Sequence, residues 1–151
     1  MNQHKGWHCW LRNPEIAAIV QEALLHFDGE RYRLIAWCVM PNHVHVIVEV
    51  LDSHPLRTIV KSWKSFTSRQ ANTRLSRTGP FWEVDYFDRY MRSEGHMLQT
   101  VEYVESNPVK AGLVDDPTAW PWSSAKARIG LLTADPVMNH ECGPGGPRSA
   151  E

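Results

Sequence analysis

Residues 31–50, RYRLIAWCVMPNHVHVIVEV, contain two apolar stretches joined by a turn, and the rest of the fold is built around them. The first stretch, residues 31–39, begins with alternating polar and apolar side chains and ends apolar, which is typical of a β-strand. Met40, Pro41 and Asn42 favour a turn, since proline cannot donate a ladder hydrogen bond and asparagine tolerates unusual backbone angles. Residues 43–50 form the second apolar stretch. The segment therefore predicts two strands joined as a hairpin.

Helical patterns lie on both sides of this hairpin. Asn13 and Pro14 are typical of a helix start, and apolar residues recur at helical spacing as far as residue 27. The same reasoning predicts a helix at 56–72, a strand at 81–90, and a helix from 93 or 94 that ends at 107, before a proline. This order indicates an α+β fold, in which helices pack on one face of a small antiparallel sheet.

The chain of 151 residues fits one domain with a hydrophobic core. We expect a single folded domain at 1–132 and a disordered tail, rich in glycine and proline, at 133–151. No apolar run approaches the roughly 18 residues of a membrane span, and the first residues do not resemble a signal peptide, so we expect a cytoplasmic protein. Cys9, Cys38 and Cys142 are too scattered for a disulfide framework or a zinc knuckle, and Cys38 is expected in the core.

Basic residues are concentrated in one segment. Between Ser53 and Trp82 there are six basic residues and no acidic one, although the whole chain has a formal net charge of -1. The pattern places them on an amphipathic helix and in the loop after it. Such a cluster is often only a solvated face, but it is also what a polyanion would contact. The proposed phosphate contacts are Arg57, Lys61, Lys64, Arg74 and Arg77.

Two pairs of side chains are candidates for chemistry. Because alternate residues of a strand share a face, His43 and His45 point the same way and are able to converge on one metal ion. Tyr103 and Asn107 are four residues apart on a predicted helix and therefore share a face as well. Each pair alone is more often ordinary: solvent-facing histidines, a surface tyrosine and a helix-ending asparagine. Their occurrence together with a basic helix favours a functional site.

Three motifs in this order resemble a known family. They are Met40-Pro41-Asn42-His43-Val44-His45, then Phe81-Trp82 with Tyr86-Phe87-Asp88-Arg89-Tyr90, and then residues 103–113, YVESNPVKAGL. Together they are similar to the REP-associated tyrosine transposases, relatives of the single-tyrosine transposases of bacterial insertion sequences. The similarity extends from about residue 31 to residue 124.

The resemblance implies a transposase-like single-stranded DNA endonuclease and strand transferase. Tyr103 would be the nucleophile that forms a 5′-phosphotyrosine intermediate, and His43, His45 and Asn107 would hold a divalent cation, Mg²⁺ or Mn²⁺. A cation is needed because the phosphodiester charge repels nucleophiles. The expected partner is single-stranded or hairpin DNA, with association with the nucleoid when bound. A homodimer is an open possibility.

Several alternatives remain open from the sequence. Tyr86 and Tyr90 are other candidate nucleophiles, and Glu102 or Glu105 is a candidate base or extra ligand. The chain as a whole would alternatively be an inactive or domesticated module that binds single-stranded nucleic acid without cutting it. A metallohydrolase that uses a metal-bound water is a more remote interpretation.

The sequence departs from the family at its start. Family members carry a strand before the first helix, in a ferredoxin-like βαββαβ order. Here only residues 6–11 would supply it, and their pattern is poor. We therefore expect translation to begin upstream of Met1 or the first strand to be lacking or degraded. In the second case an open slot beside the histidine-bearing strand would reduce stability or promote self-association.

Overall fold

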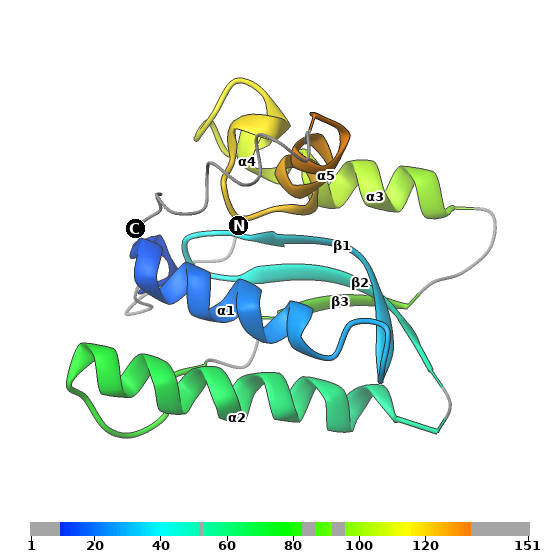
Figure 1. Cartoon of the computed structure of the whole chain (residues 1–151). Coiled ribbons are helices and arrows are strands. Elements are labelled where there is room, and N and C mark those ends of the chain that lie inside the picture. Colours follow the sequence, from blue (N-terminus) through cyan, green and yellow to red (C-terminus); the bar gives the residue numbers. More distant parts are fainter. Residues whose placement is uncertain (1–9, 52, 83–86, 92–95, 134–151) are drawn as a thin grey trace.

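The computed structural model of the chain describes residues 10–51, 53–82, 87–91 and 96–133. Helices lie above and below a small sheet in the view of Figure 1. In chain order the elements are η1 (Trp10–Arg12), α1 (Pro14–His26), β1 (Tyr32–Val39), β2 (Val44–Val50), α2 (Leu56–Leu75), β3 (Phe87–Met91), α3 (Met97–Glu105), α4 (Asn107–Lys110), η2 (Pro117–Ala119) and α5 (Ser124–Thr133). The α+β fold class expected from the sequence is confirmed.

The sheet has the strand order β1-β2-β3, with β2 in the centre. The hairpin is confirmed, because β1 and β2 pair antiparallel from Tyr32 with Val50 to Val39 with Val44. The third strand, however, runs parallel to β2, with Val44 opposite Phe87. Helix α2 is the reason: its 20 residues return the chain along about 30 Å, so β3 starts at the same end of the sheet as β2.

This topology corrects the expectation of an open slot beside the histidine-bearing strand. Both edges of β2 are occupied, by β1 on one side and β3 on the other. The described chain begins with the 3-10 helix η1, where residues 6–11 were the only candidate for a first strand; residues 1–9 lie outside the described part. The reason for expecting self-association through that slot therefore no longer applies.

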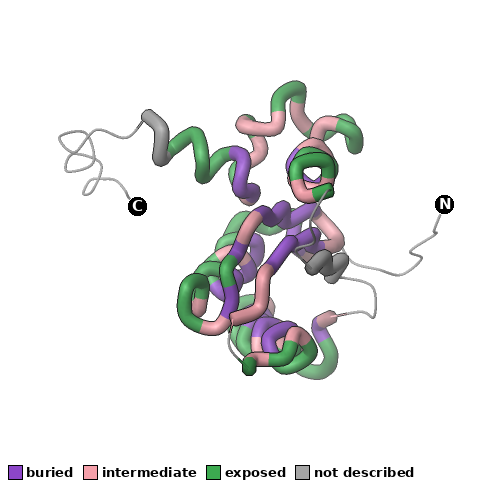
Figure 2. The backbone as a smooth tube through the Cα atoms, turned by 90° about the vertical axis from the view of Figure 1, so that its right-hand side faces the viewer, coloured by how far each residue is buried: buried purple, intermediate pink, exposed green. Residues whose placement is uncertain are grey.

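Helices cover both faces of the sheet, not one face as predicted. Helices α1 and α2 pack on one face, and α3 and α5 contact β1 from the other (Figure 1). Val44, Val46 and Val48 belong to the larger core beneath α1 and α2, whereas Ile47 packs with Val104 of α3 in a second core. Figure 2 shows the buried residues gathered along the sheet between these layers. A strand that is apolar on nearly every residue is typical of a sheet covered on both sides.

Local interactions explain the ends of α1 and its packing. The Asn13 side chain accepts a hydrogen bond of 2.9 Å from the Glu15 backbone N–H, which confirms the predicted cap. On the face toward α2, the buried Tyr32 hydroxyl donates to the Leu24 carbonyl at 2.5 Å and accepts from the Trp63 indole at 3.0 Å. These bonds satisfy polar groups inside the larger core and fix α1, β1 and α2 relative to one another.

The segment around residues 120–124 packs back on the domain. The Val39 backbone N–H donates to the Trp122 carbonyl at 2.8 Å, and the Trp120 indole donates to the Val39 carbonyl at 2.9 Å. This segment covers part of the outer edge of β1. No helix in the described part of the chain is long and apolar enough to span a membrane. Residues 134–151, almost all of the predicted tail, lie outside that part.

Candidate active site

The two candidate histidines face the same side of β2, on the layer that contains α3. Their Nε2 atoms are 2.8 Å apart, and their rings meet edge to face with centroids separated by 4.5 Å. His45 is 3% exposed, whereas His43, which immediately precedes the strand, is half-buried. Strand alternation places Val44 and Val46 in the opposite core, so the packing of those valines fixes where the imidazoles point.

This imidazole pair has the geometry of two ligands of one cation. Two imidazole nitrogens that bind one metal ion at about 2.1 Å, with a right angle between the two bonds, are about 3.0 Å apart. The observed 2.8 Å separation is close to that value, and it is also the length of a hydrogen bond between the two rings. No cluster of three or more His, Cys, Asp or Glu side chains suited to a metal is present among the described residues. A cation here would therefore take its other ligands from an amide, from water or from a substrate phosphate.

Asn42 has a role that the sequence analysis did not assign. Its Oδ1 lies 2.7 Å from His43 Nδ1. Because an amide oxygen only accepts hydrogen bonds, this contact favours the neutral tautomer of His43 with its proton on Nδ1 and a lone pair on Nε2. This is the arrangement that metal-binding histidines use to fix their tautomer and orientation. The signal in the sequence is the position of Asn42 next to His43, although the residue type by itself indicates only a turn.

Tyr103 lies beside the histidines. Its ring centroid is 6.0 Å from that of His45, and the residue is 44% exposed. The next residue along α3, Val104, is fully buried against Ile47 and determines how the helix is rotated. The Lys110 Nζ lies 5.0 Å from the centre of the Tyr103 ring. A solvent-accessible phenol thus stands between an imidazole pair and a cationic side chain.

Asn107 lies one helical turn beyond Tyr103, as predicted, although the helix is interrupted. Helix α3 ends at Glu105 and α4 begins at Asn107, with Ser106 between them. Asn107 Nδ2 donates to the Tyr103 carbonyl at 2.9 Å. This bond links the amide to the backbone of the candidate nucleophile, and it leaves Oδ1 as the atom suited to a cation.

The other acidic and aromatic candidates differ in their surroundings. Glu105 is 8% exposed and has a structural role: it accepts a hydrogen bond from Ser124 Oγ at 2.5 Å and pairs with Arg128. Cys38 lies in the core, as predicted. Its thiol pKa is raised to about 12, mainly by burial and to a smaller extent by the nearby charge of Glu105. Glu102 is exposed and shares a cavity of about 500 Å³ with Tyr103 and Lys110. Tyr86 and the Tyr90 side chain lie outside the described part.

The predicted phosphate contacts divide into two groups on the α2 layer, across the sheet from Tyr103. Arg57, Lys61 and Lys64 line a cavity of about 630 Å³ together with Phe81 and Trp82. The other two predicted contacts, Arg74 and Arg77, bind side chains and backbone groups within the protein. Arg74 pairs with Glu15 at 3.5 Å, and Arg77 donates to Asn72 Oδ1 at 2.6 Å and to the Pro80 carbonyl at 3.0 Å, with its guanidinium over Trp10.

Comparison with known proteins gives one family. The family model described as "Transposase IS200 like" matches residues 10–107. A putative REP-associated tyrosine transposase of Haemophilus influenzae is 23% identical over 106 residues, which are 62% of this chain and 58% of that protein. The REP-associated tyrosine transposase of Escherichia coli is 24% identical over 112 residues, 70% of this chain and 62% of that protein. No solved structure matches the chain.

The chain thus spans about three fifths of the length of these curated relatives. The family match covers the imidazole pair, the basic helix, Tyr103 and Asn107, and it takes in well over half of the chain. The chain therefore belongs to the family of IS200-like transposases.

Proposed function

We propose that this protein is a metal-dependent nuclease that cuts and rejoins single-stranded DNA, with Tyr103 as the nucleophile. The observation that carries the proposal is the meeting of two distant segments at one point. The exposed Tyr103 phenol of α3 lies beside His45 of β2, whose Nε2 is 2.8 Å from that of His43, the residue before β2. Membership of a transposase family and the names of the curated relatives support a DNA substrate.

His43, His45 and the Oδ1 of Asn107 would hold the cation, for which a mixed nitrogen and oxygen ligand set suits Mg²⁺ or Mn²⁺. When bound, the cation neutralises phosphate charge and orients the phosphate for in-line attack. Two imidazoles and one amide leave ligand positions for phosphate oxygens. Asn42 holds His43 with its Nε2 lone pair directed at this site.

The proposed reaction is a transesterification. Tyr103 Oη attacks the phosphorus, the bond between phosphorus and the 3′ oxygen breaks, and a 5′-phosphotyrosine linkage forms. The phenol loses its proton and the departing 3′ oxygen gains one, so the step consumes no water. The reverse step, in which a 3′-hydroxyl attacks the phosphotyrosine, joins DNA without a nucleotide cofactor. Lys110, whose Nζ lies 5.0 Å from the Tyr103 ring centre, would provide positive charge near the phosphate that Tyr103 attacks.

A covalent adduct tests the proposal directly. The protein would be incubated with single-stranded hairpin DNA labelled at its 3′ end and with Mn²⁺, and a denaturing gel would detect labelled protein. Wild type should form the adduct, and EDTA or Tyr103→Phe should abolish it. Tyr90→Phe and Tyr86→Phe are matched controls that keep every other group. If Tyr103→Phe forms the adduct as well as wild type does, the nucleophile is a different residue.

A second function is favoured by the position of the basic residues. This function is the binding of single-stranded nucleic acid without cleavage. Arg57, Lys61 and Lys64 lie on the α2 layer, across the sheet from Tyr103. Nucleic acid bound by these residues would not need the catalytic groups. In that case His43→Ala should leave DNA affinity unchanged and no adduct should form with any metal. Metal-dependent adduct formation by wild type excludes this alternative.

A further inference from the structure

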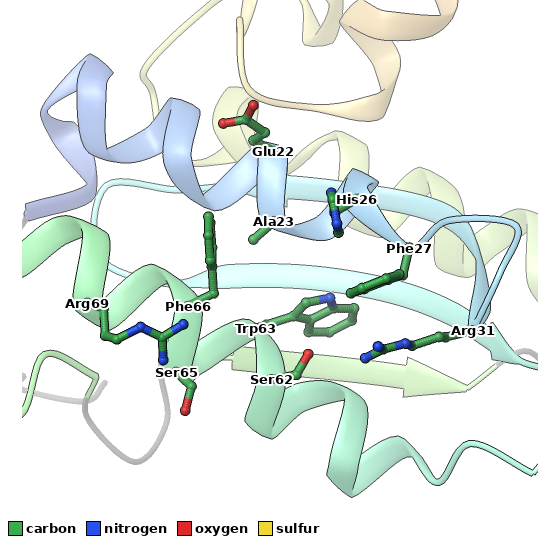
Figure 3. A pocket seen from close by; sticks show the side chains of 10 residues that line it. All are labelled: Glu22, Ala23, His26, Phe27, Arg31, Ser62, Trp63, Ser65, Phe66 and Arg69. Carbon is green, nitrogen blue, oxygen red and sulfur yellow. The ribbon is translucent and has the colours of Figure 1, made fainter.

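A cavity of about 500 Å³ lies between α1 and α2, on the opposite layer from Tyr103. Figure 3 shows its lining, with Ala23 and Phe27 contributed by α1 and its end, and Trp63 and Phe66 by α2. Trp63 is buried and belongs to the larger core, whereas Phe66 is 37% exposed. The volume lies in the range of about 300–1,000 Å³ that is common for small-molecule sites. The cavity therefore offers an apolar, aromatic wall to a ligand.

Two arginines flank this aromatic wall. Arg69 extends from α2, and Arg31 lies at the other end of the cavity, with its guanidinium 3.6 Å from the centre of the Phe27 ring (Figure 3). Neither arginine forms an ion pair with a carboxylate in the described part of the chain. Glu22 is the one acidic residue of the described lining, and it is exposed. The charge at the cavity is thus suited to an anion.

We propose that this cavity binds one unpaired nucleotide of the DNA substrate. The base would stack on the exposed Phe66 ring, and Arg69 and Arg31 would contact the phosphates on either side of it. A nucleotide in a single strand has a flat base with a phosphate on either side. A run of acidic side chains in a peptide has the charge but no aromatic face. Stacking accepts any base, so this contact selects unpaired DNA and not a sequence.

The cavity lies next to the basic groove, our name for the cavity lined by Arg57, Lys61 and Lys64, and this position supports a nucleotide as the occupant. Ser65 lines both the Phe66 cavity and the groove that contains Lys61 and Lys64, so the two lie on adjacent flanks of α2. A strand whose backbone follows the groove would thereby reach the aromatic cavity across one helix. The nucleotide would belong to the same DNA substrate, so this site rests on the proposed function. It concerns DNA binding and does not depend on cleavage.

The test is a double-mutant cycle between the protein and the DNA. Hairpins with single-stranded flanks would each carry one abasic site at a different unpaired position, and affinity would be measured by fluorescence anisotropy. Phe66→Leu should weaken binding of the intact hairpin by about 5- to 150-fold, the range expected for one stacked base. One abasic position should weaken wild-type binding to the same extent and cause no further loss with Phe66→Leu. Leu25→Ala, at another exposed apolar residue of the same layer, is the matched control.

Arg69→Gln provides an independent readout. It should lower the slope of log affinity against log salt by about 0.7, the value for one phosphate contact on a single strand. Arg12→Gln, with the same change of charge outside the cavity, should leave the slope unchanged. The proposal is overturned if Phe66→Leu binds within twofold of wild type, or if no abasic position couples to it. It is also overturned if a glutamate-rich peptide displaces the DNA from wild type but not from Arg69→Gln.

Failure of this inference is distinguishable from failure of the proposed nuclease. Adduct formation through Tyr103 at saturating DNA does not require the Phe66 cavity. Adduct without coupling to Phe66 would remove only the nucleotide site, and coupling without adduct would remove only the catalytic assignment.

Discussion

Replacing Asn42 with alanine is expected to weaken divalent metal binding without unfolding the protein. The 2.7 Å bond between Asn42 Oδ1 and His43 Nδ1 keeps the imidazole proton away from Nε2. Without that acceptor, the contact that favours the Nδ1–H tautomer of His43 is lost, and the other tautomer places the proton on Nε2, the ligand atom itself. The bond alone accounts for about 0.5–1.5 kcal/mol, or about two- to twelvefold in affinity. Loss of the tautomer adds to this, so we expect the roughly 10- to 100-fold loss that is typical of such partners.

Calorimetric titration with Mn²⁺ measures this effect directly. Asn42→Asp keeps an oxygen acceptor and should bind Mn²⁺ at least as tightly as wild type. Asn13→Ala is the matched control, since it removes the cap of α1, a helix on the opposite layer of the sheet from Tyr103. It should cost about 1 kcal/mol of stability but leave metal affinity unchanged.

The outcomes separate two assignments. If Asn42→Ala binds Mn²⁺ within twofold of wild type while His43→Ala does not bind it, then Asn42 does not orient the ligand. If His43→Ala also binds as wild type does, then the imidazole pair is not a metal site at all.

Three further predictions concern stability and DNA binding. Glu105→Ala should lower the free energy of unfolding by about 1.5–3 kcal/mol in urea denaturation, because it removes charge-assisted bonds that attach α5; a change below about 0.5 kcal/mol would contradict this role. Stability should fall as the pH rises above 9.0, by roughly tenfold in the folding equilibrium constant per unit, since the unfolded Cys38 thiol loses its proton there and the folded one does so only near pH 12. Tyr32, whose pKa burial raises above 10.0, contributes with the same sign, and Cys38→Ala should flatten the dependence in urea midpoints measured from pH 8 to 10.5. Neutralising Lys61 and Lys64 together should lower the salt slope of single-strand binding by about 1.4, and an unchanged slope would place the DNA elsewhere.

The local geometry of the site follows from short-range patterns in the sequence. Strand alternation put His43 and His45 on one face, and helical spacing put Tyr103 and Asn107 on one side of their helix, because the backbone repeats of strands and helices depend only on neighbouring residues. The cap at Asn13 and the hairpin turn were predictable for the same reason. The three motifs also indicated the transposase family, because residue identity and order along the chain are enough to define them.

The way in which these segments meet depends on tertiary packing. The sequence pattern did not show that α3 packs on the face of β2 that presents the histidines, because that choice depends on the burial of Val104 against Ile47, residues 57 positions apart. The same limit explains why helices were expected on one face and why the parallel pairing of β3 was missed. Asn42 is adjacent to His43 in sequence, yet its bond became visible only with side-chain positions. Periodicity is a short-range property of the chain, whereas docking depends on which distant apolar surfaces exclude water together.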